Sequence, residues 1–242
     1  MKSIVASILR AEESQSPEGY RWSLDPFLLV AFAGNTCKAP MMDLGCGRGI
    51  IQLLLAAGGA EQVDGIERQP LPVAAARKNL GRLPEPGRFR VVHGDLRLCR
   101  ELFAAQSYRT VLANPPYRSP KSGRIAPDPE RAGARHEMAG GLEDFIRAAA
   151  YLLKNNGHFC IVYLPERLAE LLSLMQSCKI EPKRLRMVHS REGEGAKLVL
   201  VEGRRAARPG GLKVEAPLYV YDGDDYSAEV REIYAAFGLG QE

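Results

Sequence analysis

Short apolar runs recur along the first half of the chain, each bounded by glycine, proline or charged residues. Runs of this length predict buried strands of a parallel sheet over residues 41–44, 62–66, 89–92 and 110–113. The segments between them predict helices. These helices are expected over residues 50–57, 70–80 and 98–105. Alternation of strands and helices in this order is typical of an α/β protein, with helices on both faces of a mostly parallel sheet.

The second half of the chain continues this alternation and then departs from it. Apolar residues at helical spacing predict a helix over residues 142–153, with Gly157 as its expected stop. Two later strand-like runs, 184–189 and 197–201, are joined by a glycine-rich turn and predict an antiparallel hairpin. Residues 212–221 are expected to pack on the core. Further predictions are a strand over 159–164 and helices over 4–11, 165–175, 227–237 and from Pro26 to residue 32, the last with Asp25 as its N-cap.

Composition narrows the class of protein. The chain has 242 residues, 45% of them hydrophobic, which suffices for one large core. No apolar run approaches the roughly 20 residues of a membrane span, and the first residues do not resemble a signal peptide, so a cytoplasmic protein is expected. The five cysteines have no Cys-x-x-Cys spacing and the four histidines have no metal-ligand spacing. We therefore expect free thiols, no metal and no membrane partner.

The strand over residues 110–113 ends in an unusual polar turn, Asn114-Pro115-Pro116-Tyr117. The prolines forbid both ladder bonding and a helix, so the turn lies at the carboxyl edge of the sheet, where α/β proteins bind ligands. The Asn114 amide oxygen and the Pro115 carbonyl can accept the hydrogens of a flat amine, such as N6 of adenine, which frees its lone pair. The Tyr117 ring can stack on a base taken out of its helix, a contact worth roughly 1–3 kcal/mol. The alternative is a turn that merely ends a strand.

Three other strand ends offer groups for a single nucleoside. Asp43 precedes a Gly-x-Gly-x-Gly loop, which differs from the Gly-x-Gly-x-x-Gly of dinucleotide sites. Glu67 ends the next strand, where an acid can bind both hydroxyls of a ribose. Asp95 ends the third strand and can meet an adenine amino group, while Leu96 can cover the ring. For Asp95 a helix N-cap is the alternative, and Cys46 within the loop is interpreted as a small loop residue.

Basic residues are concentrated directly after the polar turn. The formal net charge of +4 and the pI near 8.8 are compatible with a nucleic-acid partner without requiring one. A position beside the candidate base pocket favours contacts with phosphate over a merely solvated loop. The residues assigned to RNA binding are Arg118, Lys121, Arg124, Arg131 and Arg135, and a second cluster is Arg204, Arg205, Arg208 and Lys213.

The glycine loop, Glu67, Asp95-Leu96 and the Asn-Pro-Pro-Tyr turn together resemble the S-adenosylmethionine-dependent methyltransferases that modify nitrogen. This resemblance implies a Rossmann-like α/β fold whose mostly parallel sheet has seven strands, with helices on both faces and a C-terminal antiparallel hairpin. It also implies S-adenosyl-L-methionine as cofactor. The cofactor-binding residues would be Asp25, Asp43, Gly45, Cys46, Gly47, Gly49, Glu67, Arg68, Asp95, Leu96 and Asn114, and the catalytic residues Asn114, Pro115, Pro116 and Tyr117.

A narrower resemblance covers nearly the whole chain. The segments 19–25, 195–202 and 211–221 are similar to the bacterial tRNA adenine-N6 methyltransferases that act beside the anticodon of a valine tRNA. Residues 1–17 depart from the strand-rich lead usual in that family. The implied substrate is adenine N6 in structured RNA, above all tRNA. The implied organisation is one domain over 1–242, with an N-terminal cap segment at 1–34, a catalytic core at 39–202 and a C-terminal extension at 203–242.

Four alternatives share parts of this pattern. Enzymes that methylate a release-factor glutamine have the same turn, but they place a helical domain before the glycine loop, and only about forty residues precede Asp43 here. DNA adenine would require a sizeable target-reading domain. Methylation of rRNA guanine N2 is a third possibility. A module that binds RNA or cofactor without catalysis is the fourth, against which the intact Asp43, Glu67 and Asn114 argue.

Overall fold

The computed structural model describes residues 1–14, 23–117 and 141–240, and its centre is a mixed sheet with the strand order β3-β2-β1-β4-β5-β7-β6-β8. The first five strands in this order are parallel, whereas β7 runs antiparallel to both β5 and β6. Because β1 to β4 are parallel, their carboxyl ends meet at one edge. The seven main strands are β1 (Met41–Leu44), β2 (Val63–Glu67), β3 (Phe89–His93), β4 (Tyr108–Ala113), β5 (Leu153–Tyr163), β6 (Ile180–His189) and β7 (Ala196–Arg205).

The predicted fold class is confirmed, with a small correction to the number of strands. The sheet has nine strands rather than seven, because two short strands, β8 (Lys213–Val214) and β9 (Leu218–Tyr219), pair with β6. They come from the tail that was expected only to pack on the core. A separate two-stranded antiparallel sheet follows, formed by β10 (Tyr221–Asp222) and β11 (Asp225–Tyr226).

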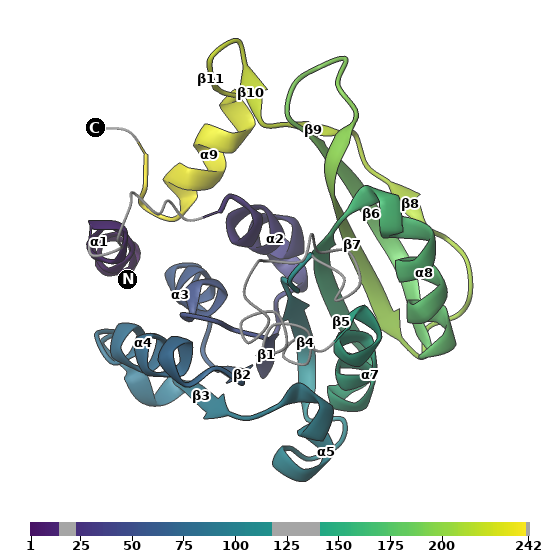
Figure 1. Cartoon of the computed structure of the whole chain (residues 1–242), viewed down its shortest axis with the longest axis horizontal. Coiled ribbons are helices and arrows are strands. Elements are labelled where there is room, and N and C mark those ends of the chain that lie inside the picture. The colour runs from purple at the N-terminus through teal and green to yellow at the C-terminus, as the bar shows by residue number, and fades with distance from the viewer. Residues whose placement is uncertain (15–22, 118–140, 241–242) are drawn as a thin grey trace, which may run out of the picture.

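Helices cover both faces of the sheet, as Figure 1 shows. Helix α3 lies over one face, and all eight of its residues are buried because α1, α2 and α4 surround it. A second apolar cluster fills the opposite face beneath α7 and α8. The helices of the first face are α1 (Lys2–Ser14), α2 (Asp25–Ala33), α3 (Ile50–Ala57), α4 (Pro70–Leu80) and α9 (Ala228–Ala236), and those of the second are α5 (Cys99–Leu102), α7 (Leu142–Leu152) and α8 (Leu168–Ser177).

Two local predictions were wrong. The helix expected over 98–105 is confined to the single turn of α5, preceded by the short 3₁₀ helix η3 (Leu96–Leu98). Gly157 does not end helix α7, which stops at Leu152; it lies inside β5. A Cβ at Gly157 would come within 3.0 Å of the Arg109 carbonyl oxygen on β4. This glycine therefore serves the close approach of two strands.

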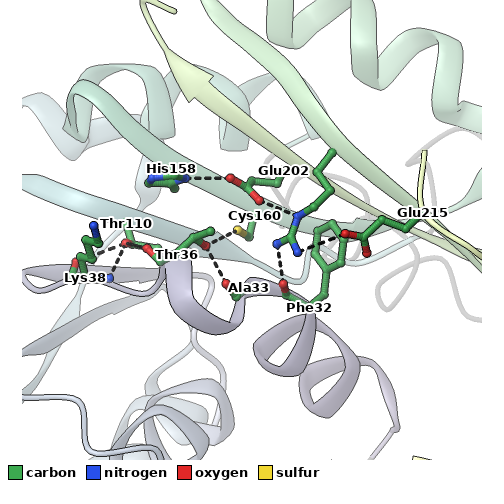
Figure 2. A network of polar contacts seen from close by, with 10 residues as sticks. Phe32, Ala33, Thr36, Lys38, Thr110, His158, Cys160, Glu202 and Glu215 are labelled. Atoms are coloured by element: carbon green, nitrogen blue, oxygen red, sulfur yellow. Dashed lines mark hydrogen bonds and ion pairs between the residues drawn. The ribbon is translucent and has the colours of Figure 1, made fainter. Parts of the chain in front are cut away.

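A buried polar network fixes the C-terminal end of α2 to the sheet (Figure 2). Glu202 on β7 accepts a hydrogen bond from Arg184 Nε at 2.8 Å and contacts His158 Nδ1 at 2.7 Å. The same arginine donates to the Phe32 carbonyl, and its guanidinium lies 4.1 Å from the centre of the Phe32 ring. Paired and hydrogen-bonded charges of this kind tolerate burial. The position of α2 relative to the strands is thus set by specific contacts as well as by apolar packing.

Membrane spans and cysteine pairing can both be examined in the described residues. No helix in the described part of the chain is long and apolar enough to cross a membrane. All five cysteines are free, and Cys46, Cys99 and Cys160 are buried.

Candidate functional site

A cavity of about 300 Å³ opens at the edge where the parallel strands end. Residues at or just after the ends of β1, β2, β3 and β4 line this cavity, so its walls come from segments that are far apart in the sequence. Ligands of open α/β sheets bind at this edge. Its lining is Gly45, Ile66, Glu67, Arg68, Gln69, Gly94, Asp95, Leu96, Asn114, Pro116 and Phe145. Seven residues singled out from the sequence therefore share one cavity: Gly45, Glu67, Arg68, Asp95, Leu96, Asn114 and Pro116.

The loop between β1 and α3 can take its shape only with glycine at three positions. Gly45, Gly47 and Gly49 have φ values of +69°, +53° and +83°, in the left-handed region that side chains disfavour. A Cβ at Gly45 would also lie 3.2 Å from the ring of Phe145. Phe145, predicted only as a core residue of its helix, thus forms a wall of the cavity. The helical spacing of Phe145 in the sequence did not indicate that its ring would also contact the glycine loop.

Glu67 holds the glycine loop against the end of β2. Its Oε2 accepts a hydrogen bond from the Gly47 amide at 3.1 Å, and its Oε1 accepts one from the Gln69 amide at 2.7 Å. Each carboxylate oxygen can accept a second bond. The side chain is therefore fixed in place and still able to accept hydrogen bonds from a pair of hydroxyl groups in the cavity.

Asp43 lies in β1, immediately before the glycine loop in the chain. It is fully buried, and neither carboxyl oxygen has a hydrogen-bond partner among the described residues. Burial, and then the nearby Glu67, raise the pKa of this carboxyl to about 8. A buried acid without a partner is costly, so such groups mark places where a ligand supplies the missing contact. Asp43 does not line the cavity itself, but it lies two residues before Gly45, which does, and its oxygens could accept hydrogen bonds from the donor groups of a ligand.

Replacing Asp43 by asparagine should stabilise the ligand-free protein in a pH-dependent way. The pKa of Asp43 is about 8 in the folded protein and near 3.8 in the unfolded chain. Between about pH 4 and pH 8 the folded protein therefore holds a proton on Asp43 that the unfolded chain has lost. As the pH rises from about 4 to about 8, the free energy of unfolding of the wild type should therefore fall relative to that of Asp43→Asn. Above about pH 8 the difference between the two proteins should stay constant. Melting temperatures of both proteins across this range test the prediction. A difference independent of pH would contradict it.

Asp95 serves as a cap in the structure, which was the alternative for this residue. Its Oδ1 accepts the Arg97 amide at 2.9 Å and so caps η3, and both of its oxygens contact the Arg97 guanidinium. The hydrogen bond from Arg97 lowers the pKa of the carboxyl despite its partial burial. Capping and lining are compatible, since Asp95 and the neighbouring Leu96 both face the cavity.

The Asn-Pro-Pro-Tyr turn begins directly after the last residue of β4. Asn114 and Tyr117 are half-buried, Pro115 is buried and Pro116 is exposed. The Tyr117 hydroxyl lies 3.1 Å from Asn114 Oδ1, and its ring meets Tyr163 edge-on with centroids 6.1 Å apart. The tyrosine therefore packs against the end of β5 as well as bounding the turn.

The prediction that Asp25 caps helix α2 was wrong. Leu24 occupies the N-cap position, and no side chain caps the helix. Asp25 begins the helix and uses its carboxylate elsewhere, accepting a hydrogen bond from the Tyr117 hydroxyl at 2.5 Å. It is not among the residues that line the cavity. Asp25 was predicted to bind the cofactor, and the local sequence holds no signal for its contact with Tyr117, 92 residues away.

Several predictions fall on residues that the structure does not describe. Among them are all five residues assigned to RNA binding, Arg118, Lys121, Arg124, Arg131 and Arg135, and the segment 19–22. Across residues 1–14, 23–117 and 141–240, no group of three or more histidine, cysteine or acidic side chains could hold a metal ion.

Residues 26–179 match the family model of the methyltransferase small domain. A tRNA1(Val) (adenine(37)-N6)-methyltransferase of Porphyromonas gingivalis is 30% identical over 213 residues, which cover 85% of this chain and 83% of that protein. The corresponding protein of Bacteroides fragilis is 27% identical over 87% of this chain and 89% of its own length. A predicted O-methyltransferase from Agrobacterium tumefaciens has a similar fold, with a TM-score of 0.69, 22% identity and coverage of 90% and 98% of the two chains.

Proposed function

Because the chain belongs to the methyltransferase small domain family and is an S-adenosylmethionine-dependent N-methyltransferase, we propose that it methylates the exocyclic N6 amine of an adenine in tRNA. The observation that carries the proposal is the single cavity that unites Glu67 and Asp95 with Asn114. The names of the related proteins support adenine 37 of a valine tRNA as the target. A tRNA substrate implies a cytoplasmic enzyme.

The chain offers suitable groups for S-adenosylmethionine. Glu67 would accept the two ribose hydroxyls, Asp95 the adenine amino group, and Leu96 would cover the adenine ring. The amides of the glycine loop and the unpartnered Asp43 would meet the polar methionine end. When bound, the cofactor supplies a methyl group on a positively charged sulfur.

The acceptor amine would be held by the Asn-Pro-Pro-Tyr turn. The Asn114 amide oxygen and the Pro115 carbonyl would each accept one amine hydrogen, which favours the pyramidal nitrogen with a free lone pair. Held in this way, the nitrogen lone pair would be directed at the methyl group that the cofactor supplies, and the electrons of the broken bond would stay with sulfur. No general base is assigned, because the extra proton on nitrogen can leave after the transfer. Positioning in a cavity that excludes water would supply most of the acceleration.

The substrate class can be tested directly. The protein is incubated with S-adenosylmethionine labelled in its methyl group and, in separate reactions, with total tRNA, total rRNA and a release factor. We expect label in the tRNA. Label only in the release factor would replace adenine by a glutamine amide, and label only in rRNA would exclude tRNA as the substrate. No label in any fraction from a protein that binds the cofactor would favour a binding module.

RNA affinity should depend steeply on salt through the basic residues that follow the turn. If Arg118, Lys121 and Arg124 contact phosphates, replacing all three by alanine should reduce the slope of log affinity against log salt by about 0.7–0.9 per lost contact. Fluorescence anisotropy at several salt concentrations measures this slope. The control removes equal charge from the exposed Lys78, Arg82 and Arg88, at and beyond the last turn of α4. Equal slopes for the two triple variants would mean that Arg118, Lys121 and Arg124 do not contact phosphates of the RNA.

A further inference from the structure

Asp25, Tyr117 and Asn114 form a hydrogen-bonded chain that ends at the cavity. The Tyr117 oxygen lies 2.5 Å from Asp25 Oδ2 and 3.1 Å from Asn114 Oδ1. A tyrosine hydroxyl has one proton, so it can donate to only one of these two acceptors. The question is which acceptor receives it, because the answer sets the orientation of the Asn114 amide.

The carboxylate of Asp25 is the stronger acceptor. Hydrogen bonds to ionised groups are roughly twice as strong as bonds between neutral groups, and Asp25 is a carboxylate whereas the Asn114 amide is neutral. Asp25 also occupies the first turn of α2, where the helix dipole favours negative charge. Burial, and then Asp25, raise the pKa of Tyr117 far above its ordinary value, so the phenol keeps its proton.

If the proton points to Asp25, the Tyr117 oxygen has only lone pairs to offer Asn114. The side of the Asn114 amide that faces Tyr117 must then be its NH₂ group. The oxygen and nitrogen of an asparagine amide are assigned from the hydrogen-bond network, and here the network favours this assignment. The amide oxygen is then directed away from Tyr117 and left free to accept a hydrogen bond in the cavity that Asn114 lines.

We propose that Asp25 is a positioning residue, which acts through Tyr117 to turn the Asn114 amide oxygen toward the acceptor amine. The inference rests on the proposed function, since it assumes that Asn114 binds the amine. It gives Asp25 a role different from that of a cofactor ligand, and it makes the Tyr117 hydroxyl necessary in addition to the ring. It also explains why a helix of the N-terminal segment reaches the turn.

The fold holds Asp25 in this position from the far end of its helix. Arg184 and Glu202 secure the C-terminal residues of α2 to β6 and β7 (Figure 2). Phe27, Leu28 and Leu29 of the same helix are buried in the core. An anchored helix can place a carboxylate more accurately than a free loop can.

The negative charge behind the amide should matter most during methyl transfer. Positive charge would develop on the acceptor nitrogen as it takes the methyl group, and a carboxylate that polarises the Asn114 oxygen through two hydrogen bonds would stabilise that charge. Loss of Asp25 should therefore reduce the rate of the chemical step and leave cofactor binding intact.

A double-mutant cycle of Asp25→Asn and Tyr117→Phe tests the proposal. Each single variant should lower the single-turnover rate on tRNA by about 10- to 150-fold, the range for a hydrogen bond to a charged group. The double variant should be no slower than the slower single variant, because without the Tyr117 hydroxyl the charge of Asp25 no longer acts on Asn114. Calorimetry with S-adenosylhomocysteine should give affinities within about twofold of the wild type for all three. Melting temperatures verify folding.

Tyr108→Phe is the matched control. Tyr108 donates a hydrogen bond to a carboxylate, Asp64, at 2.6 Å, but within the sheet and away from the cavity. Its removal should lower the melting temperature and leave the single-turnover rate near that of the wild type. The control thus separates the general loss of a tyrosine–carboxylate bond from the loss of this one.

Two results would overturn the inference. Weaker binding of S-adenosylhomocysteine by Asp25→Asn, with losses that add to those of Tyr117→Phe, would make Asp25 a cofactor ligand. A single-turnover rate of Tyr117→Phe equal to that of the wild type would mean that the Tyr117 hydroxyl is not needed and that only its ring contributes. Neither result affects the substrate assignment, which fails only if the wild type itself does not methylate tRNA.

Discussion

Replacing Asn114 by alanine should lower the single-turnover rate of methylation on the order of 100- to 1,000-fold, as loss of one preorganised hydrogen bond to a reacting group does in other enzymes. Asn114 would contact the nitrogen whose geometry changes between ground state and transition state, so its contribution falls on the chemical step. Affinity for S-adenosylhomocysteine should change little. Rapid-quench measurement of label transfer, with calorimetry beside it, separates the two effects.

The control for this variant is Asn155→Ala, which removes the same side chain from an exposed position on β5. It should behave as the wild type. If Asn114→Ala also transferred the methyl group at the wild-type rate, the Asn-Pro-Pro-Tyr segment would be a turn that only ends β4.

Replacing Glu67 by alanine should weaken S-adenosylhomocysteine binding by roughly 1.5–3 kcal/mol, the contribution of hydrogen bonds to a charged group. Both carboxylate oxygens already hold backbone amides, those of Gly47 and Gln69, at the rim of the cavity. The variant therefore loses the proposed ribose contact together with the support of the glycine loop. Isothermal calorimetry measures the loss.

Glu67→Gln helps to separate the two contributions of this side chain. It keeps one amide oxygen to accept from the loop and loses the charge, so its affinity should fall between those of wild type and Glu67→Ala. NAD binding by the wild type without binding of S-adenosylhomocysteine would contradict the assignment of the cavity.

The elements with the clearest hydrophobic pattern were predicted best. Strand β1 and helix α3 have the bounds expected from sequence, because each is an apolar run between strong turn signals. Helix α4 also has its expected bounds, which Pro70 at its start and Gly81 after its end indicate. Parallel strands also expose their carboxyl ends together, so placing Glu67, Asp95 and Asn114 at strand ends was enough to predict that they would lie near one another. The structure brings all three to the same cavity.

Contacts between distant segments could not be predicted in this way. Asp25 before Pro26 has the local pattern of a helix cap, but a hydroxyl 92 residues further along the chain binds its carboxylate instead. Gly157 has the local pattern of a helix stop, but it lies in β5, where the absence of a side chain lets the backbone of Arg109 on β4 come close. The pairing of β8 and β9 with β6 depends on a neighbour that their two-residue lengths do not specify. In each instance tertiary contacts override local propensity.

Nucleoside analysis tests most directly whether the chain methylates N6 of one adenine in tRNA, as we propose. A valine tRNA transcript with adenine at position 37 and a copy with guanine there are each incubated with the protein and S-adenosylmethionine. Both are then digested and analysed by mass spectrometry. We expect N6-methyladenosine from the first transcript and none from the second. Equal methylation of both transcripts, or a methylated nucleoside other than N6-methyladenosine, would contradict the account.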